Sequence, residues 1–457
     1  MQLHRVLLRR TRFWLHITIA YLLRYKLRFL VVIFILLFSI LCAKQIWPKV
    51  SRANLVTIGY VGSYTIENLP TEVLSLATQP LISVDKSGHP TASLASHWTV
   101  SDDGKTYVVF LKDNLLWHDL SSVDAKDISI AITNVQIKAL NNKAIEFKLP
   151  NPIISFPLAL DRPVFKVKSF YGTGQFRIVD MDLKEDIVKK ISLIPKDKNL
   201  PRVDIKFYQV EDQALNALKI GEIKRAEITN AQLFEKWPNL DVEKIVDQSK
   251  VITIFYNTLD PLLASKDFRQ ALSYSINRID FDGIEATSPI SPASWAYNNG
   301  VKRYEYNTGK SKSLLSKEEI TSPKITLSTS PDLETLAEKI KKDWEEIGIE
   351  TTIKIEKGIP SNFQAFLVVN QLNPDPDQYA LWHSTQTKTN LTHYKNVKID
   401  KLLEDARSTV EEQKRKELYA DFQRFLVEDA PATFLYYPYK YKITYKNIQN
   451  LIAKLPQ

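Results

Sequence analysis

The clearest pattern of hydrophobic and polar positions lies in the third quarter of the chain. Residues 324–329 alternate apolar and polar side chains, as a half-buried strand does. Ser330 and Pro331 follow as an N-cap and a first-turn proline, and apolar residues at helical spacing then continue to a stop at Gly348. Residues 349–355 alternate again. Strand, helix and strand in this order predict a right-handed βαβ unit with parallel strands, and therefore an α/β fold.

The same two periodicities recur on both sides of this unit. Apolar residues at helical spacing predict helices over 268–276, 399–406 and 418–426, the last before Pro431. Alternating or continuous apolar runs predict strands over 55–61, 106–112, 203–208, 251–257, 363–369 and 432–437. Mixed helices and strands thus extend from residue 55 almost to the end of the chain.

An uncharged apolar run precedes this region, at residues 29–43, between Arg28 and Lys44. It predicts one transmembrane helix, which the long flanking side chains extend at both ends. The alternative is a cleavable signal peptide, but 28 residues precede the run and Lys44 follows it where a small residue is expected. Lipidation of Cys42 is disfavoured because Leu41 precedes it instead of a small residue.

Charge is distributed unevenly along the chain. The 457 residues include 61 Lys and Arg against 52 Asp and Glu, a net charge of +9. Residues 1–50 carry nine of the basic side chains and no acidic one, which leaves 52 against 52 in the remainder. Seven of the nine precede the apolar run, so the positive-inside rule places the N-terminus in the cytoplasm and the rest outside. A neutral body disfavours nucleic acid as a partner.

Catalytic and metal-binding motifs are not recognisable in the sequence. A single cysteine excludes an intramolecular disulfide and a cysteine-built metal site. Gly309-Lys-Ser311 lacks the earlier glycine of a phosphate loop, and Gly172-Thr-Gly174 is better interpreted as a tight turn than as a dinucleotide motif. The histidines have no HxH or HExxH spacing. We therefore predict no metal and no cofactor; a hydrolase would need acids such as Asp375 and Asp377 to converge with a further catalytic group.

Asp375 and Asp377 are the most suggestive acidic residues. They lie in the sequence Asn-Pro-Asp-Pro-Asp, directly after the predicted strand 363–369. The carboxyl ends of strands are where α/β sheets place ligands, so both carboxylates are candidates for ligand contact. The alternative is that Asp377 caps a helix beginning at Gln378.

Several strings, in order, resemble one family. They are Gly104–Asp119 with its Trp-His-Asp turn, Asp124–Ile128, Gly172–Phe176, Ala217–Glu222, Phe255–Thr258, Phe268–Ile276, Asp400–Ala406, Arg415–Tyr419 and Glu428–Pro431. Together they are similar to the extracellular solute-binding proteins of family 5, the oligopeptide- and dipeptide-binding type that serves ABC importers. The resemblance covers most of residues 54–445.

The resemblance implies a two-lobed periplasmic-binding-protein type II fold with mixed sheets, preceded here by the N-terminal transmembrane helix. Lobe I is expected over 51–256, completed by 430–457, and lobe II over 257–429, after the anchor in residues 1–50. In peptide-binding relatives an aspartate in the loop corresponding to Asp375 or Asp377 pairs with the peptide amino terminus. Trp295, Trp382 and Tyr64 are candidate cleft aromatics, with core or interface packing as the alternative for each.

Two departures from the family pattern affect the cleft. Leu120 replaces the glycine of the Trp-His-Asp-Gly turn, so we expect that turn to differ locally or to avoid positive φ. In addition, only about fifty residues separate Trp117 from Val167, where relatives usually have a longer helical subdomain. This shortening removes part of one wall of the expected cleft.

The sequence therefore predicts a monomeric receptor, held in the cell membrane by residues 29–43, that captures peptides or another small solute outside the cytoplasm. It would deliver them to an ABC transporter permease without catalysis. The alternative is a sensory or structural ectodomain that keeps the binding-protein fold without the import function.

Overall fold

The computed structural model describes residues 54–85, 87–318, 320–373 and 375–456, together with Trp14 and His16. The apolar run 29–43, on which the transmembrane prediction depends, lies outside these residues. Within the part of the chain described, no helix combines the length and the apolar composition needed to cross a membrane.

The βαβ unit has the predicted form. Strand β17 (Lys324–Thr329) leads through a 3-10 turn (Pro331–Leu333) into helix α7 (Glu334–Glu346), and β18 (Glu350–Ile355) follows. The two strands pair in parallel along their whole lengths. Gly348 has φ +91°, the left-handed conformation expected of a helix stop. The parallel α/β prediction is confirmed.

One twelve-stranded mixed sheet runs through the molecule, in the order β10-β11-β12-β1-β13-β20-β15-β19-β17-β18, with β14 and β16 also paired to β20. One half contains β1 (Leu55–Val61), β10 (Phe176–Lys184), β11 (Ile187–Pro195), β12 (Arg202–Tyr208), β13 (Arg225–Ile228) and β14 (Leu240–Val246). The other contains β15 (Lys250–Tyr256), β16 (Gly283–Glu285), β17, β18 and β19 (Ala365–Gln371). We call these halves lobe I and lobe II.

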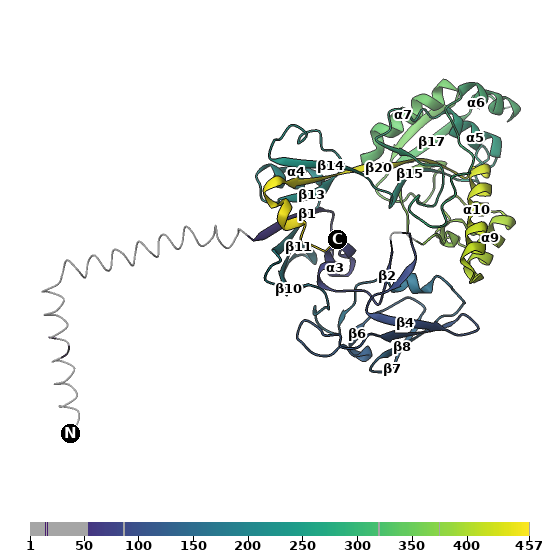
Figure 1. Ribbon diagram of the computed structural model, residues 1–457. Helices are drawn as coiled ribbons and strands as arrows, with labels where there is room; N and C mark the ends of the chain where they lie inside the picture. The colour runs from purple at the N-terminus through teal and green to yellow at the C-terminus, as the bar shows by residue number, and fades with distance from the viewer. Residues whose placement is uncertain are drawn as a thin grey trace.

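Strand β20 (Ala432–Tyr445) belongs to both lobes. Its first half pairs with β15 and β16, and its second half pairs with β13 and β14. The chain therefore passes between the lobes twice, at residues 246–250 and near residues 437–441 (Figure 1). Strand β15 and the first half of β20, which the expected boundaries at 256 and 430 assign to lobe I, pair with lobe II strands. We keep the two-lobe division as a proposal, with these two crossings as its hinge.

Helices cover the sheet on both faces. In lobe I they are α3 (Thr71–Ala77), α4 (Glu211–Lys219) and α11 (Gln449–Ile452). In lobe II they are α5 (Lys266–Ser275), α6 (Thr308–Leu315), α7, α8 (Tyr379–Trp382), α9 (Val397–Ser408) and α10 (Glu412–Asp429). Helices α5 and α7 bury one face of the lobe II sheet, and α9 and α10 bury the opposite face. The predicted helices 268–276, 399–406 and 418–426 lie within or nearly within α5, α9 and α10.

Residues 79–164 form a separate small unit, which we call the arm, below both lobes in Figure 1. Its strands are β2 (Ile82–Val84), β3 (Pro90–Ala92), β4 (Ala95–Val100), β5 (Thr106–Leu111), β6 (Ile128–Ser129), β7 (Gln136–Asn141) and β8 (Ala144–Lys148), and β6 pairs with β9 (Phe165–Lys166) just beyond. The core of the arm is built around Trp117, whose side chain is fully buried. Among its described residues the helical segments are short 3-10 turns.

The Trp-His-Asp turn of the arm keeps the conformation that glycine would favour. Leu120 has φ +67°, and its N–H donates to the carbonyl of Trp117 at 2.9 Å. Of the two alternatives expected for this turn, the avoidance of positive φ is therefore wrong. The leucine side chain is 78% exposed and is therefore not packed in a hydrophobic core. Its Cβ strains the backbone because the left-handed conformation is unfavourable for residues other than glycine.

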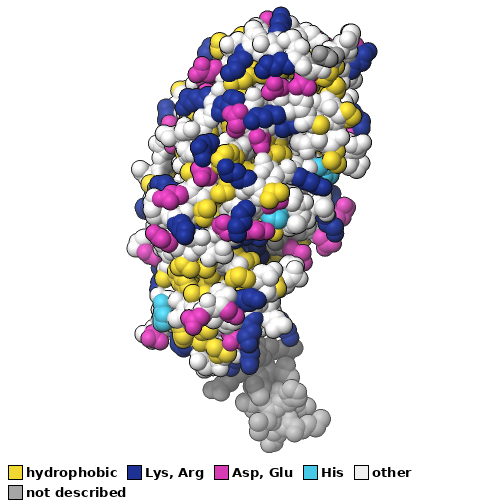
Figure 2. Space-filling model, turned by 90° about the vertical axis from the view of Figure 1, so that its right-hand side faces the viewer, with side chains coloured by type: hydrophobic (Ala, Val, Ile, Leu, Met, Phe, Trp, Pro, Cys, Tyr) yellow, Lys and Arg dark blue, Asp and Glu magenta, His cyan; other side chains and the backbone are white. Residues whose placement is uncertain are grey.

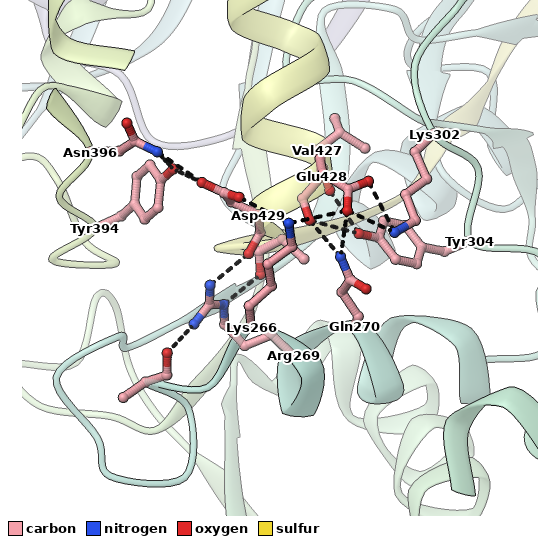
Figure 3. Close-up of polar contacts among 12 residues, drawn as sticks. Lys266, Arg269, Gln270, Lys302, Tyr304, Tyr394, Asn396, Val427, Glu428 and Asp429 are labelled. Atoms are coloured by element: carbon pink, nitrogen blue, oxygen red, sulfur yellow. Dashed lines mark hydrogen bonds and ion pairs between the residues drawn. The ribbon is translucent and has the colours of Figure 1, made fainter. Parts of the chain in front are cut away.

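A buried arginine joins two of the family-like strings in lobe II (Figure 3). Arg269 in α5 donates to the carbonyls of Leu263, Ala264, Asp429 and Ala430 at distances of 2.6–3.0 Å. The last two lie at the carboxyl end of α10, where Ala430 has φ 48°. A fixed positive charge thus satisfies helix-end carbonyls that would otherwise be unpaired in the core.

Charges on the surface are mixed in sign. Figure 2 shows Lys and Arg interspersed with Asp and Glu over the face that it presents. This agrees with the equal numbers of basic and acidic residues beyond residue 50.

Candidate functional site

The loop between β19 and α8 holds Asp375 and Asp377 through its own hydrogen bonds. The N–H of Asp377 donates to Oδ1 of Asp375 at 3.1 Å, and the N–H of Tyr379 donates to Oδ1 of Asp377 at 2.9 Å. The second bond is similar to a helix-capping bond, the alternative role expected for Asp377, since Tyr379 is the first residue of α8. Both carboxylates are thereby held in fixed positions beyond the carboxyl end of β19.

Asp377 has a cationic partner. Its Oδ2 lies 2.7 Å from Nε of Arg407, near the end of α9. The Arg407 guanidinium also stacks over the ring of Tyr379, with Cζ 4.0 Å from the ring centroid. This contact compensates the charge of Asp377 within the protein.

Asp375, unlike Asp377, forms no ion pair within the described part of the chain. Burial, reinforced by the negative charge of Asp377, raises its pKa to about 6. The Ser155 hydroxyl and the Arg415 charge act in the opposite direction and only partly offset this rise. The close guanidinium therefore belongs to Asp377, and the carboxylate of Asp375 is left without a close cationic partner among the described residues.

Arg415 and Trp295 lie next to this pair of acids. The Arg415 Cζ is 5.1 Å from the Trp295 ring centroid, and Trp295 packs edge-on against Tyr419 at 6.0 Å. The charges of both acids act on the Tyr419 hydroxyl, whose pKa is raised mainly by burial. Trp295 thus lies in the neighbourhood of Asp375 and Asp377, and a ligand role for these three residues stays a prediction.

The arm meets lobe II at this place. The N–H of Trp295 donates to the carbonyl of Ser87 at 2.9 Å, and the His89 ring stacks on the Trp295 ring at 6.0 Å. Nε2 of His89 lies 3.2 Å from Oε2 of Glu412. The N–H of Ile154 donates to the carbonyl of Arg407 at 3.3 Å. The acidic loop therefore lies at a junction between two separately packed units.

Trp382 and Tyr64 lie elsewhere. Trp382 is 1% exposed and packs between Phe255 and Phe434, so its surroundings are those of a core residue. Tyr64 is half-buried in lobe I, where its ring contacts Phe207 at 5.3 Å. A ligand role for either residue stays a prediction.

Sequence reasoning missed the residues that set the charge balance of the site. Arg407 and Arg415 follow the acids by thirty and forty residues on different helices, and Ser155 comes from the arm. None has a local spacing to either aspartate that would signal the contact. The packing of the arm, α9 and α10 against the acidic loop brings these three residues close to the two aspartates.

An open cavity of about 440 Å³ lies apart from this junction, on lobe II. It is lined by Asn257, Leu259, Asp260, Thr326, Ser328, Lys354, Asn362, Phe363 and Gln364. Its Asp260 already accepts a hydrogen bond from Gln364, so its polar groups partly satisfy one another. No group of three His, Cys, Asp or Glu that could hold a metal ion occurs among the described residues.

The chain is similar to known binding proteins over most of its length. It is 25% identical to the "Oligopeptide-binding protein AppA" of Bacillus subtilis, across 89% of this chain and 90% of that protein. The solved structure of AppA in complex with a nonapeptide superposes with a TM-score of 0.67 at 23% identity, covering 87% of this chain and 97% of AppA. NikZ of Campylobacter jejuni, solved with Ni(L-His), has a TM-score of 0.71 at 22% identity, with 86% and 94% coverage.

The structural likenesses show the two-lobed binding-protein fold and leave the ligand open, since a peptide complex and a nickel–histidine complex share it. Residues 89–391 match the profile of the bacterial extracellular solute-binding proteins, family 5. The match runs from the arm into lobe II and includes Trp295, Asp375 and Asp377. The chain therefore belongs to family 5 of the bacterial extracellular solute-binding proteins.

Proposed function

We propose that this protein is a peptide receptor of an ABC importer, which encloses a peptide between its two lobes outside the cytoplasm. Curated relatives that cover most of the chain support a peptide ligand, because they are named oligopeptide- or dipeptide-binding proteins. The family consists of binding proteins, which supports capture without catalysis.

The observation that carries this proposal is the uncompensated carboxylate of Asp375. A buried carboxylate with its pKa raised to about 6 costs free energy when it is ionised. An ammonium group placed beside it would offset that cost by a charge-assisted hydrogen bond. The amino terminus of a peptide supplies such a group, whereas Asp377 is already occupied by Arg407.

The two chain crossings support closure around the ligand. Residues 246–250 and the middle of β20 join the lobes, and hinge motions of this kind need only a few residues to change conformation. The arm contacts lobe II directly beside Asp375, so closing and ligand contact would occur at the same junction.

Residues 29–43 are proposed to anchor the receptor as a single-pass membrane protein with its N-terminus in the cytoplasm. The support is the uncharged apolar sequence and the excess of basic residues before it. A tethered, monomeric receptor stays at high local concentration near its permease, which favours delivery of captured peptides.

Thermal unfolding of the full chain in lipid nanodiscs tests the peptide proposal. Bound solutes are first removed by partial unfolding and refolding, and a panel of di- to nonapeptides is compared with N-acetylated versions of the same peptides. A ligand that binds the native state raises the melting temperature. We expect a shift of several degrees that N-acetylation abolishes.

Two variants sharpen this test. Asp375→Asn should fold and lose the shift, whereas Asp332→Asn, at an exposed position of lobe II, should keep it. A full shift with N-acetylated peptides would contradict the recognition of the peptide amino terminus by Asp375. The absence of a shift with any peptide would favour the sensory or structural ectodomain. Peptide cleavage abolished by Asp375→Asn would instead identify a hydrolase.

A further inference from the structure

Several strands of lobe I begin or end on the same side of the sheet. We call this row of strand ends the entry edge. Leu55, the first residue of β1, is paired with Arg202, the first residue of β12. Phe176, at the start of β10, is paired with Pro195, at the end of β11. Tyr445, the last residue of β20, is paired with the first residue of β14. These ends and the turns beside them lie together although they are far apart in the sequence.

Basic side chains accumulate on the entry edge. They are Arg177, Lys196, Lys198, Arg202, Lys224, Lys446 and Lys454. Two acids accompany them, Asp197 and Asp241, and each accepts a hydrogen bond from a neighbouring amide. The entry edge therefore carries a clear excess of positive charge on a body that is neutral as a whole.

These basic residues lack ionic partners within the described part of the chain. Instead, Lys196 donates to the carbonyl of Thr173, Lys446 to that of Pro238 and Lys454 to that of Asn199. Carbonyl dipoles thus hold the charges of these three lysines in place, and no carboxylate of the described residues neutralises them.

Three lysines further along the lobe I strands do have carboxylate partners. Lys190 pairs with Asp204, Lys206 with Glu222 and Lys440 with Glu227, each at 2.9 Å. Paired and unpaired basic residues therefore both occur on the lobe I sheet, whereas at the entry edge all seven lack an ion pair within the described part of the chain.

The chain enters lobe I at this edge. The N–H of Arg202 donates to the carbonyl of Asn54 at 2.9 Å, and the Asn54 amide donates to the carbonyl of Leu200. Figure 1 shows the start of β1 at the outer side of lobe I, beside the C-terminal helix. The sequence between residues 43 and 54 contains three further basic residues, Lys44, Lys49 and Arg52, and no acid.

Chain length limits how far this edge can lie from the apolar run. Ten residues lie between positions 43 and 54, and even a fully extended chain joins these two positions over at most about 40 Å. With residues 29–43 in the membrane, as proposed above, the entry edge is the part of the folded body closest to its attachment point.

We propose that the entry edge binds the headgroups of anionic phospholipids and so holds lobe I against the membrane that anchors the chain. Clustered Lys and Arg side chains are attracted to anionic headgroups within a Debye length of the surface. Carboxylate partners would cancel this attraction, which is consistent with their absence from the described residues of the edge. The inference rests on the proposed membrane anchor.

Hydrogen exchange of the full chain tests this proposal, with the chain reconstituted into vesicles of phosphatidylcholine alone or with added phosphatidylglycerol. In anionic vesicles we expect amides of residues 196–202 and 449–456 to exchange at least about fivefold more slowly than in neutral vesicles. High salt should abolish the difference, because it screens exposed charges. Equal exchange in both vesicle types would overturn the proposal.

Charge variants give a matched control. Lys198→Glu with Arg202→Glu should remove the protection, whereas Lys312→Glu with Lys388→Glu, at exposed positions of lobe II, should keep it. Loss of protection in both double variants would show that total charge, and not this edge, is responsible.

Flotation of the chain with vesicles distinguishes membrane attachment through residues 29–43 from lipid binding by the entry edge. If the chain floats with neutral vesicles in high salt, the anchor holds, whatever the exchange data show. If it floats only with anionic vesicles at low salt, the anchor fails while the edge still binds lipid.

Discussion

The side chains of Arg407 and Asp377 form a 2.7 Å ion pair that leaves Asp375, two residues earlier, without an ionic partner in the described structure. The guanidinium comes from α9 and stacks on the face of the Tyr379 ring where it reaches the acidic loop. This pairing divides two adjacent acids into one that is neutralised internally and one that is available to a cation. It makes Asp375 the better candidate for recognising an ammonium group.

Removing Arg407 should destabilise the protein through Asp377. Arg407→Met would leave the Asp377 carboxylate, with 12% of its side chain exposed, close to Asp375 without a cation. We expect a loss of about 2 kcal/mol in the free energy of unfolding, below the value for a fully buried pair because Arg407 is partly exposed. Urea denaturation measures the change.

A double-mutant cycle provides the control. Adding Asp377→Asn to Arg407→Met should recover more than half of the loss, because no unpaired charge then remains at position 377. Strictly additive losses would mean that the two side chains act independently.

Asp375 should make stability depend on pH. Its pKa is raised from 3.8 to about 6 in the folded protein, so the folded state binds a proton more tightly than the unfolded chain. The resulting stabilisation is fully present below pH 3.8 and is lost as the pH rises through about 6. We expect a loss of about 2 kcal/mol between pH 4 and pH 7.5 in the ligand-free protein.

Comparison with Asp375→Asn isolates this contribution. The variant should be more stable than the parent at pH 7.5 and show a flatter profile in urea unfolding between pH 4 and pH 7.5. The exposed Asp332→Asn change serves as the control and should leave the profile as it is in the parent. A parental slope in Asp375→Asn would assign the dependence to other groups.

Relief of backbone strain at Leu120 should stabilise the arm. The residue has φ +67° and its side chain is 78% exposed, so glycine would remove the strain while losing little packing. We expect Leu120→Gly to raise the free energy of unfolding by about 1 kcal/mol. Leu120→Ala keeps the Cβ and should change stability much less; equal gains in both variants would point to the exposed leucine side chain instead.

Arg269 should be far more important for stability than the lysine beside it. Arg269→Met would leave the carbonyls of Leu263, Ala264, Asp429 and Ala430 without their donor, and we expect a loss of about 3 kcal/mol or more. Lys266→Met removes only part-exposed ion pairs with Glu428 and Asp429 and should cost less than about 1 kcal/mol. Similar losses in the two variants, measured by urea unfolding, would contradict the capping role.

The sequence by itself determined the class of fold and part of the secondary structure, chiefly the longer helices and strands of lobe II. Periodicity gave the βαβ unit at residues 324–355, and Gly348 ends α7 because the left-handed conformation is readily accessible to glycine. Ordered strings identified the family, since each depends on residues close together in the chain. The acidic loop was found in the same way, from two aspartates and two prolines after a strand.

Only the tertiary structure decided what those residues do. Strand β20 serves both lobes, a property that no local pattern in residues 432–445 encodes. Leu120 adopts a glycine-like conformation because the surrounding turn holds it there, against its own preference. Asp375 and Asp377 look equivalent in the sequence, and only the packing of α9 gives one of them a guanidinium partner. Charge balance depends on distance in space, which residues thirty positions apart acquire only when the chain has folded.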